Sequence, residues 1–135
     1  MTSLYVDSSA IIKLYVIEEF AEQCKKIIGE YDDKYISKIG VTETLINLRK
    51  RLSSHEFAMA ARFFEIDLAA FNIIDFDEQA SDLAIEISQG TNLATLDAIH
   101  LASAISVSSK AIDFLTYDTV QRKAAKSLGL KTPWS

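Results

Sequence analysis

The chain has few of the residues that shape small, flexible or cross-linked proteins, with one cysteine, one proline and four glycines among its 135 residues. A single cysteine, Cys24, cannot form an internal disulfide, which fits a cytoplasmic protein and excludes a disulfide scaffold. The low proline and glycine content excludes a low-complexity chain. We expect one domain spanning residues 1–135 with a core of its own.

Long apolar runs and an excess of basic charge are also missing. No stretch approaches the ~18 apolar residues that a membrane-spanning helix needs, and the N-terminus has neither the basic nor the apolar region of a signal peptide. We therefore expect no membrane association. The 14 Lys and Arg residues face 19 acidic ones, a net charge of −5. This disfavours nucleic-acid binding through a broad basic surface but leaves room for phosphate contacts through a metal and a few local cations.

Apolar runs rich in β-branched and aromatic residues alternate with helical patterns along the chain. Strands are predicted at 3–6, 34–37, 71–74, 111–117 and 130–134. Helices are predicted at 10–29, 41–52, 55–70, 77–88, about 92–108 and 119–128. Strands that alternate with helices indicate parallel βαβ units and a three-layer α/β/α architecture.

Four carboxylates occupy corresponding places in this pattern: Asp7 closes the first strand, Asp118 follows the fourth, and Glu43 and Asp97 lie just inside helix starts. These positions meet at one edge of a parallel sheet, where helix dipoles favour anions. Clustered carboxylates repel one another unless a cation lies between them, and Mg²⁺ and Mn²⁺ take oxygen ligands. The pattern predicts a divalent-metal site with Asp7 and Asp97 as the first-choice direct ligands.

A purely structural role stays open for each acid, because Asp is a common helix cap and the chain has many acids. Spacing alone indicates a possible metal site and no more. Ser8, Ser37 and Thr116 are candidates for orienting ligands or water by hydrogen bonding, with capping as the alternative. His100 shares a helix face with Asp97, and we interpret it as a packed, hydrogen-bonded histidine in preference to a metal ligand.

Four sequence blocks carry a family resemblance: Tyr5-Val6-Asp7-Ser8-Ser9-Ala10-Ile11-Ile12-Lys13-Leu14-Tyr15; Ile36-Ser37 with Val41-Thr42-Glu43; Thr95-Leu96-Asp97-Ala98-Ile99-His100-Leu101-Ala102; and Phe114-Leu115-Thr116-Tyr117-Asp118. In this order and at these separations they resemble PIN-domain proteins, in particular the VapC-type toxins of prokaryotic toxin–antitoxin pairs. One departure is Ala94, where many relatives have Arg. That difference is expected to alter RNA contacts and to leave the metal ligands intact.

The resemblance implies a PIN-like α/β/α domain with a five-stranded parallel sheet. It also implies that Asp7, Glu43, Asp97 and Asp118 bind Mg²⁺ or Mn²⁺ and carry catalysis. The implied activity is endoribonuclease cleavage of structured RNA, such as tRNA or rRNA, by a water that the metal activates. The implied partners are a cognate antitoxin protein and a second copy of the chain in a homodimer.

Two other functions remain open from the sequence. One is a housekeeping RNA-processing nuclease of the same fold. The other is a non-enzymatic α/β binding module whose acids are helix caps and surface residues. The helical segment 57–71 carries more apolar surface than one face needs, which indicates a dimer or antitoxin contact, with ordinary core packing as the alternative.

Overall fold

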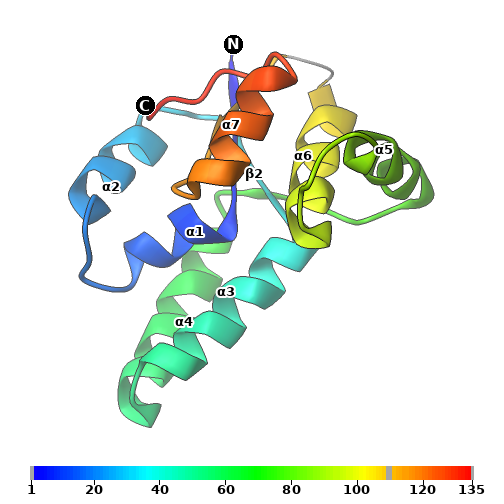
Figure 1. Cartoon of the computed structure of the whole chain (residues 1–135). Helices are drawn as coiled ribbons and strands as arrows, with labels where there is room; N and C mark the ends of the chain where they lie inside the picture. The colour runs from blue at the N-terminus through cyan, green and yellow to red at the C-terminus, as the bar shows by residue number, and fades with distance from the viewer. Residues whose placement is uncertain (1, 109–110, 135) are drawn as a thin grey trace.

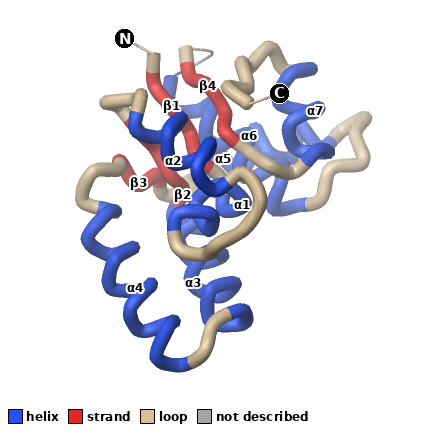
Figure 2. The backbone as a smooth tube through the Cα atoms, turned by 90° about the vertical axis from the view of Figure 1, so that its left-hand side faces the viewer, coloured by secondary structure: helices blue, strands red, loops and turns tan. Residues whose placement is uncertain are grey.

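Short parallel strands form the centre of the protein in a computed structural model that describes residues 2–108 and 111–134 (Figures 1 and 2). Within the described residues the sheet has four strands in the order β3-β2-β1-β4, and every neighbouring pair is parallel. The strands are β1 (Ser3–Val6), β2 (Lys34–Ser37), β3 (Asn72–Ile74) and β4 (Ile112–Leu115). The chain runs from β1 through β2 to β3 on one side of β1 and then crosses to β4 on its other side, so the strand order reverses between β1 and β4. Such a reversal point is where open α/β sheets bind their ligands.

Helical segments connect the strands and cover the sheet on both sides. They are α1 (Ser8–Ile11), the short 3₁₀ turn η1 (Ile12–Leu14), α2 (Ala21–Gly29), α3 (Lys38–Arg51), α4 (Ser54–Leu68), α5 (Glu78–Ser88), α6 (Thr95–Ser108) and α7 (Thr119–Ser127). None of the described helices is long and apolar enough to cross a membrane. The parallel sheet flanked by helices confirms the predicted fold class.

The side chains of β1 alternate between two hydrophobic cores, one on each face of the sheet. Leu4 and Val6 pack in a core with residues of α1, α2 and α4. Tyr5 points to the opposite face and packs in a core with residues of α5, α6 and α7. Because successive side chains of a strand point to opposite faces, a strand that is buried on both sides favours apolar residues at consecutive positions, here Leu4, Tyr5 and Val6. The whole of β1 is accordingly buried.

The predicted fifth strand at 130–134 does not form, so the prediction of five strands is wrong for this chain. The segment lies beside β4 and makes one backbone hydrogen bond, from the Phe114 amide to the Lys131 carbonyl, at 2.8 Å. Pro133 has no N–H to donate, so the segment cannot continue a ladder of hydrogen bonds. It begins instead as the cap of α7, where Gly129 takes φ +86° and the Leu130 amide bonds the Ala125 carbonyl.

The predicted helix at 10–29 is broken between η1 and α2. Lys13 holds the break, because its ammonium donates to the Glu19 carbonyl at 2.8 Å and to the Glu18 carboxylate at 3.1 Å. Phe20 then takes a left-handed conformation with φ +66° just before α2. Its ring packs against Tyr117 and Trp134, contacts from the far end of the chain that local periodicity does not reveal.

Helices α3 and α4 form a helical pair that extends away from the sheet (Figures 1 and 2). The Ser53 hydroxyl accepts from the Glu56 amide while the Glu56 carboxylate accepts from the Ser53 amide, a reciprocal cap that fixes the start of α4. This arrangement leaves one flank of α4 free to line a groove, described below.

Candidate functional site

Asp7 lies where the central strand ends, at the carboxyl edge of the sheet. Its amide donates to the Leu115 carbonyl of β4 at 3.1 Å, and its carboxylate caps α1 by accepting from the Ala10 amide at 3.3 Å. The side chain is only 4% exposed. Burial, the largest effect, raises the pKa of this carboxyl, while His100 and the hydroxyls of Ser9 and Thr116 oppose the rise. Asp7 is therefore a buried acid at a site that favours a nearby cation.

Hydroxyl groups join the ends of β1 and β4. Ser9 donates to Asp7 Oδ1 at 2.6 Å, accepts from the Tyr117 amide at 2.9 Å, and lies 3.3 Å from the Thr116 hydroxyl. Thr116 in turn accepts from the Asp118 amide at 3.1 Å. This network links the loop that carries Asp7 to the loop that carries Asp118.

The hydroxyl that bonds Asp7 comes from Ser9, one residue after the Ser8 that sequence reasoning had selected. Ser8 instead lines a polar hollow of about 410 Å³ beside the acids, together with Lys13, Asn47 and Arg51. The sequence signal for Ser9 was its place two residues after a helix cap, where a short side chain can turn back toward the capping carboxylate.

Asp118 caps the helix that follows β4. Its Oδ1 accepts from the Val120 amide at 2.9 Å and the Gln121 amide at 3.1 Å. The side chain is exposed. Asp118 thus caps α7 and also lies at the edge of the sheet. Both roles considered from the sequence, helix cap and metal ligand, remain open for it.

Glu43 lies in the second turn of α3 and points at a histidine of α6. The Ser37 hydroxyl starts α3 by accepting from the Gly40 amide at 2.8 Å. Glu43 Oε1 then lies 2.5 Å from His100 Nε2, and His100 Nδ1 lies 2.6 Å from the hydroxyl of Tyr5. The predicted reading of His100 as packed and hydrogen-bonded is confirmed, since the residue is 3% exposed. Its partner Glu43 was not foreseen.

The negative charges of the other three acids all act on Asp97. Its pKa is raised first by burial, then by the negative charges of Asp118, Asp7 and Glu43, with His100 opposing them. Because the charges of three other carboxylates contribute to this rise, Asp97 lies in a region of negative potential. Ala94, which precedes this helix, is exposed.

The carboxylate oxygens of the four acids suit a hard divalent cation, but they do not form a complete coordination shell. Within residues 2–108 and 111–134, no group of three or more Asp, Glu, His or Cys side chains is close enough to hold an ion. Three of the acids are engaged by protein donors instead: Asp7 by Ser9, Glu43 by His100 and Asp118 by the start of α7. Carboxylate oxygens are the ligands that Mg²⁺ and Mn²⁺ prefer, so the four acids would supply fitting donors.

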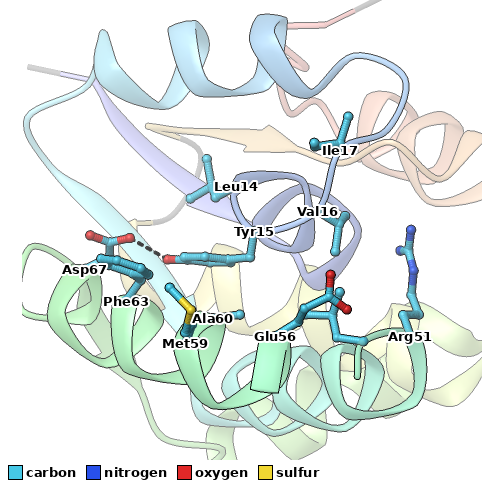
Figure 3. Close-up of a pocket in the computed structure, with 11 residues that line it drawn as sticks. Leu14, Tyr15, Val16, Ile17, Arg51, Glu56, Met59, Ala60, Phe63 and Asp67 are labelled. Carbon is cyan, nitrogen blue, oxygen red and sulfur yellow. Dashed lines mark hydrogen bonds between the residues drawn. The ribbon is translucent and has the colours of Figure 1, made fainter. Parts of the chain in front are cut away.

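A groove of about 750 Å³ runs between the η1 region and α4 (Figure 3). Tyr15 crosses its floor and donates to Asp67 Oδ2 at 2.6 Å. Phe63, which is 55% exposed, and Met59 line it from α4, and the fully exposed Ile17 stands at its edge. The predicted apolar excess of segment 57–71 is confirmed, since Met59, Phe63 and Ile66 of α4 are exposed. Met59 and Phe63 line this groove.

The model of the PIN-domain family matches residues 4–127. This chain belongs to the PIN-domain family. Among curated proteins it is similar to ribonuclease VapC46 of Mycobacterium tuberculosis, with 33% identity over 130 residues, covering 96% of this chain and 95% of that protein.

Two solved structures share the fold. One is FitAcB from Neisseria gonorrhoeae, with a TM-score of 0.76 and 20% identity, over 96% of this chain and 95% of that one. The other is a toxin–antitoxin complex from Klebsiella pneumoniae, with a TM-score of 0.68 and 22% identity, over 86% of this chain and 87% of that one.

Proposed function

We propose that this protein is a Mg²⁺- or Mn²⁺-dependent endoribonuclease and the toxin of a toxin–antitoxin pair. The observation that carries the proposal is the convergence of acids from distant segments at the edge of the sheet. Val6, which precedes Asp7, pairs with Leu115 of β4, and the carboxylates of Asp118, Asp7 and Glu43 all lie near enough to Asp97 to raise its pKa, together with burial. The likeness to a ribonuclease over nearly the whole chain supports it. A site at the strand-order reversal of a parallel sheet is also where the chemistry of such folds is found.

Each acid has a role in this proposal. Asp7 and Asp97 would hold the ion directly, while Glu43 and Asp118 would hold it directly, through water, or at a second position. When bound, the ion supplies a Lewis acid and lowers the pKa of a water at the site. Ser9 and the Ala10 amide both donate to Asp7 Oδ1 and keep the carboxylate in a fixed orientation, and we assign Oδ2 to the cation.

The proposed substrate is structured RNA such as tRNA or rRNA, which also locates the protein in the cytoplasm. The net charge of −5 is compatible with this substrate because cations lie beside the acids. Lys13 and Arg51 line the polar hollow next to Asp7, with Glu18 between them at 3.1 and 2.6 Å. An RNA phosphate that displaced Glu18 would meet both cations.

The proposed protein partners are a cognate antitoxin and a second copy of the chain. The groove between η1 and α4 offers apolar side chains rimmed by Glu56 and Asp67, so it suits an apolar antitoxin segment that carries basic residues. Exposed Phe76, Ile85 and Leu96 on and beside α5 and α6 are available for a homodimer contact. A similar fold was solved as a toxin–antitoxin complex.

RNA cleavage tests the proposal directly. Purified protein with Mn²⁺ should produce new RNA ends that disappear when a chelator is added or when Asp97 is replaced by Asn. Mapping the ends by sequencing after induced expression, beside the same variant, identifies the RNA. Wild-type cleavage by Asp97→Asn would refute the site. An antitoxin-like reading frame next to the gene would favour a toxin over a housekeeping nuclease. A protein whose stability does not respond to metal and that cleaves no RNA would be a binding module.

A further inference from the structure

A line of three side chains runs from the sheet to the candidate site. The Tyr5 hydroxyl lies 2.6 Å from His100 Nδ1, and His100 Nε2 lies 2.5 Å from Glu43 Oε1. Tyr5 is fully buried and His100 is 3% exposed, whereas the Glu43 side chain is 21% exposed. The line therefore begins in the core, on the central strand, and ends on an acid at the edge of the sheet.

The carboxylate of Glu43 decides which way these hydrogen bonds run. An ionised carboxylate can only accept, so we assign the donor to His100 Nε2, 2.5 Å from Glu43 Oε1. A neutral imidazole that is protonated on Nε2 leaves Nδ1 as an acceptor for the phenol hydrogen of Tyr5, 2.6 Å away. In this arrangement each imidazole nitrogen has one hydrogen-bond partner.

The backbone of α3 is shaped to let the imidazole approach. Gly40 lies one turn before Glu43, and a Cβ at Gly40 would stand 3.4 Å from His100 Cε1, 3.3 Å from the Ser37 hydroxyl and 3.2 Å from Ile36. Glycine is unfavourable inside a helix, so its presence here is explained by this close approach. The edge of the Tyr5 ring also meets the imidazole, with 5.9 Å between the ring centres.

We propose that His100, oriented by Tyr5, is a positioning residue that holds the Glu43 carboxylate in one orientation at the edge of the sheet. A free glutamate side chain samples many rotamers and would lose that freedom on binding a cation. A donor fixed by the core removes this loss in advance. The inference rests on the proposed function, because Glu43 matters only if the acids hold an ion.

Two substitutions of His100 test its two hydrogen bonds separately. In His100→Gln the amide nitrogen occupies the place of Nε2 and can still donate to Glu43, whereas in His100→Asn an amide can serve Tyr5 but does not reach Glu43. Tyr5→Phe keeps the ring, including its stack on Phe114, and removes only the hydroxyl. Matched controls are His55→Gln, in an exposed part of α4, and Tyr31→Phe, which loses a 2.6 Å bond to Asp113.

Mn²⁺ binding to each variant, measured by calorimetry beside its melting temperature, gives the main test. We expect His100→Asn to weaken binding by about ten- to a hundred-fold, the usual effect of losing a residue that orients a ligand. His100→Gln should bind more tightly than His100→Asn, and both controls should bind as the wild type does. If His100→Asn binds as tightly as the wild type while Asp97→Asn does not bind, the positioning role is wrong and the metal site stands. If both bind as the wild type does, both proposals fall.

The metal-free protein offers a second test that remains valid even if a variant folds poorly. The chain has two histidines, so His55→Gln leaves the imidazole of His100 as the single histidine signal in a nitrogen NMR spectrum. We expect an unprotonated Nδ1 and a protonated Nε2, and a loss of this single form in the Tyr5→Phe variant. A proton found on Nδ1 with none on Nε2 would overturn the proposal.

Discussion

The buried side chain of Gln121 donates a hydrogen bond of 3.2 Å to the backbone carbonyl of Asp97. Gln121 lies in the first turn of α7, whose cap is Asp118, so this bond ties the start of α7 to the first turn of α6. Two acids that are 21 residues apart in the sequence are thereby held at one edge of the sheet. The relative position of Asp97 and Asp118 is consequently set by a core residue, without the help of a cation.

Replacing Asp97 by Asn should stabilise the metal-free protein at neutral pH by a few degrees in melting temperature. The pKa of Asp97 is raised from 3.8 by burial and by nearby carboxylates, so the folded state binds this proton more tightly than the unfolded chain does. The ionised Asp97 therefore lowers the free energy of unfolding at any pH above its raised pKa, and this effect fades as the pH falls to 3.8 and below. The gain in Asp97→Asn should fade in the same window. Asp82→Asn, on an exposed part of α5, is the matched control.

Mn²⁺ should raise the melting temperature of the wild-type protein and leave that of Asp97→Asn nearly unchanged. A ligand that binds only the folded state stabilises it by about 2.7 kcal/mol at a hundred times its Kd. Thermal scans over a series of Mn²⁺ concentrations measure this directly. An equal rise in both proteins would locate the binding elsewhere, and Ca²⁺ in place of Mn²⁺ tests whether the site discriminates between cations of different size.

The two roles of Asp118 can be separated by two substitutions. Asn caps a helix about as well as Asp, whereas Ala does not, and loss of such a cap costs about 1 kcal/mol. Asp118→Asn should therefore keep the stability of the protein, and Asp118→Ala should lower it by about that amount. If Asp118 also serves the cation, both variants should cleave RNA poorly. Chemical denaturation and an RNA cleavage assay distinguish the outcomes, and full activity of Asp118→Asn would leave only the cap.

A charge placed in the groove should weaken antitoxin binding without affecting RNA cleavage. Phe63 is exposed on the groove side of α4 (Figure 3) and is not among the acids or their hydrogen-bond partners. We expect Phe63→Lys to reduce affinity for the cognate antitoxin by at least about thirty-fold, a loss typical of a buried aromatic anchor. Val107→Lys, at an exposed position near the end of α6, is the control. Equal binding by the two variants would exclude the groove as the contact.

Local sequence patterns predicted most of the fold because the residues that face each core recur with the period of the strand or helix that carries them. β1 and β2 begin and end where predicted, since each closes at a residue that caps the next helix, Asp7 for the first and Ser37 for the second. The unbroken helix at 10–29 was wrong because the break involves partners far away in the chain, such as the contact of Phe20 with Trp134, and periodicity within a segment carries no information about such partners. The predicted fifth strand was wrong for a local reason, since Pro133 has no N–H and the segment begins as the cap of α7.

The candidate site was harder to predict than the fold. The four acids were selected by their positions and by a family resemblance, and whether they bind a metal stays a prediction. Ser9 could have been found from its place two residues after the capping Asp7. The pairing of His100 with Glu43 could not, because it depends on side-chain directions that are set only when α3 and α6 lie against the sheet.

The strand order β3-β2-β1-β4 has a consequence for the time at which the proposed activity first arises. The central strand with Asp7 is synthesised first, but its neighbour β4 is the last strand to leave the ribosome, and Asp97 and Asp118 both belong to the final third of the chain. A nascent chain that has not yet reached residue 97 holds only Asp7 and Glu43 of the four acids. A site that needs all four forms only after Asp118 has been made, so the proposed activity cannot arise on the earlier part of the chain alone.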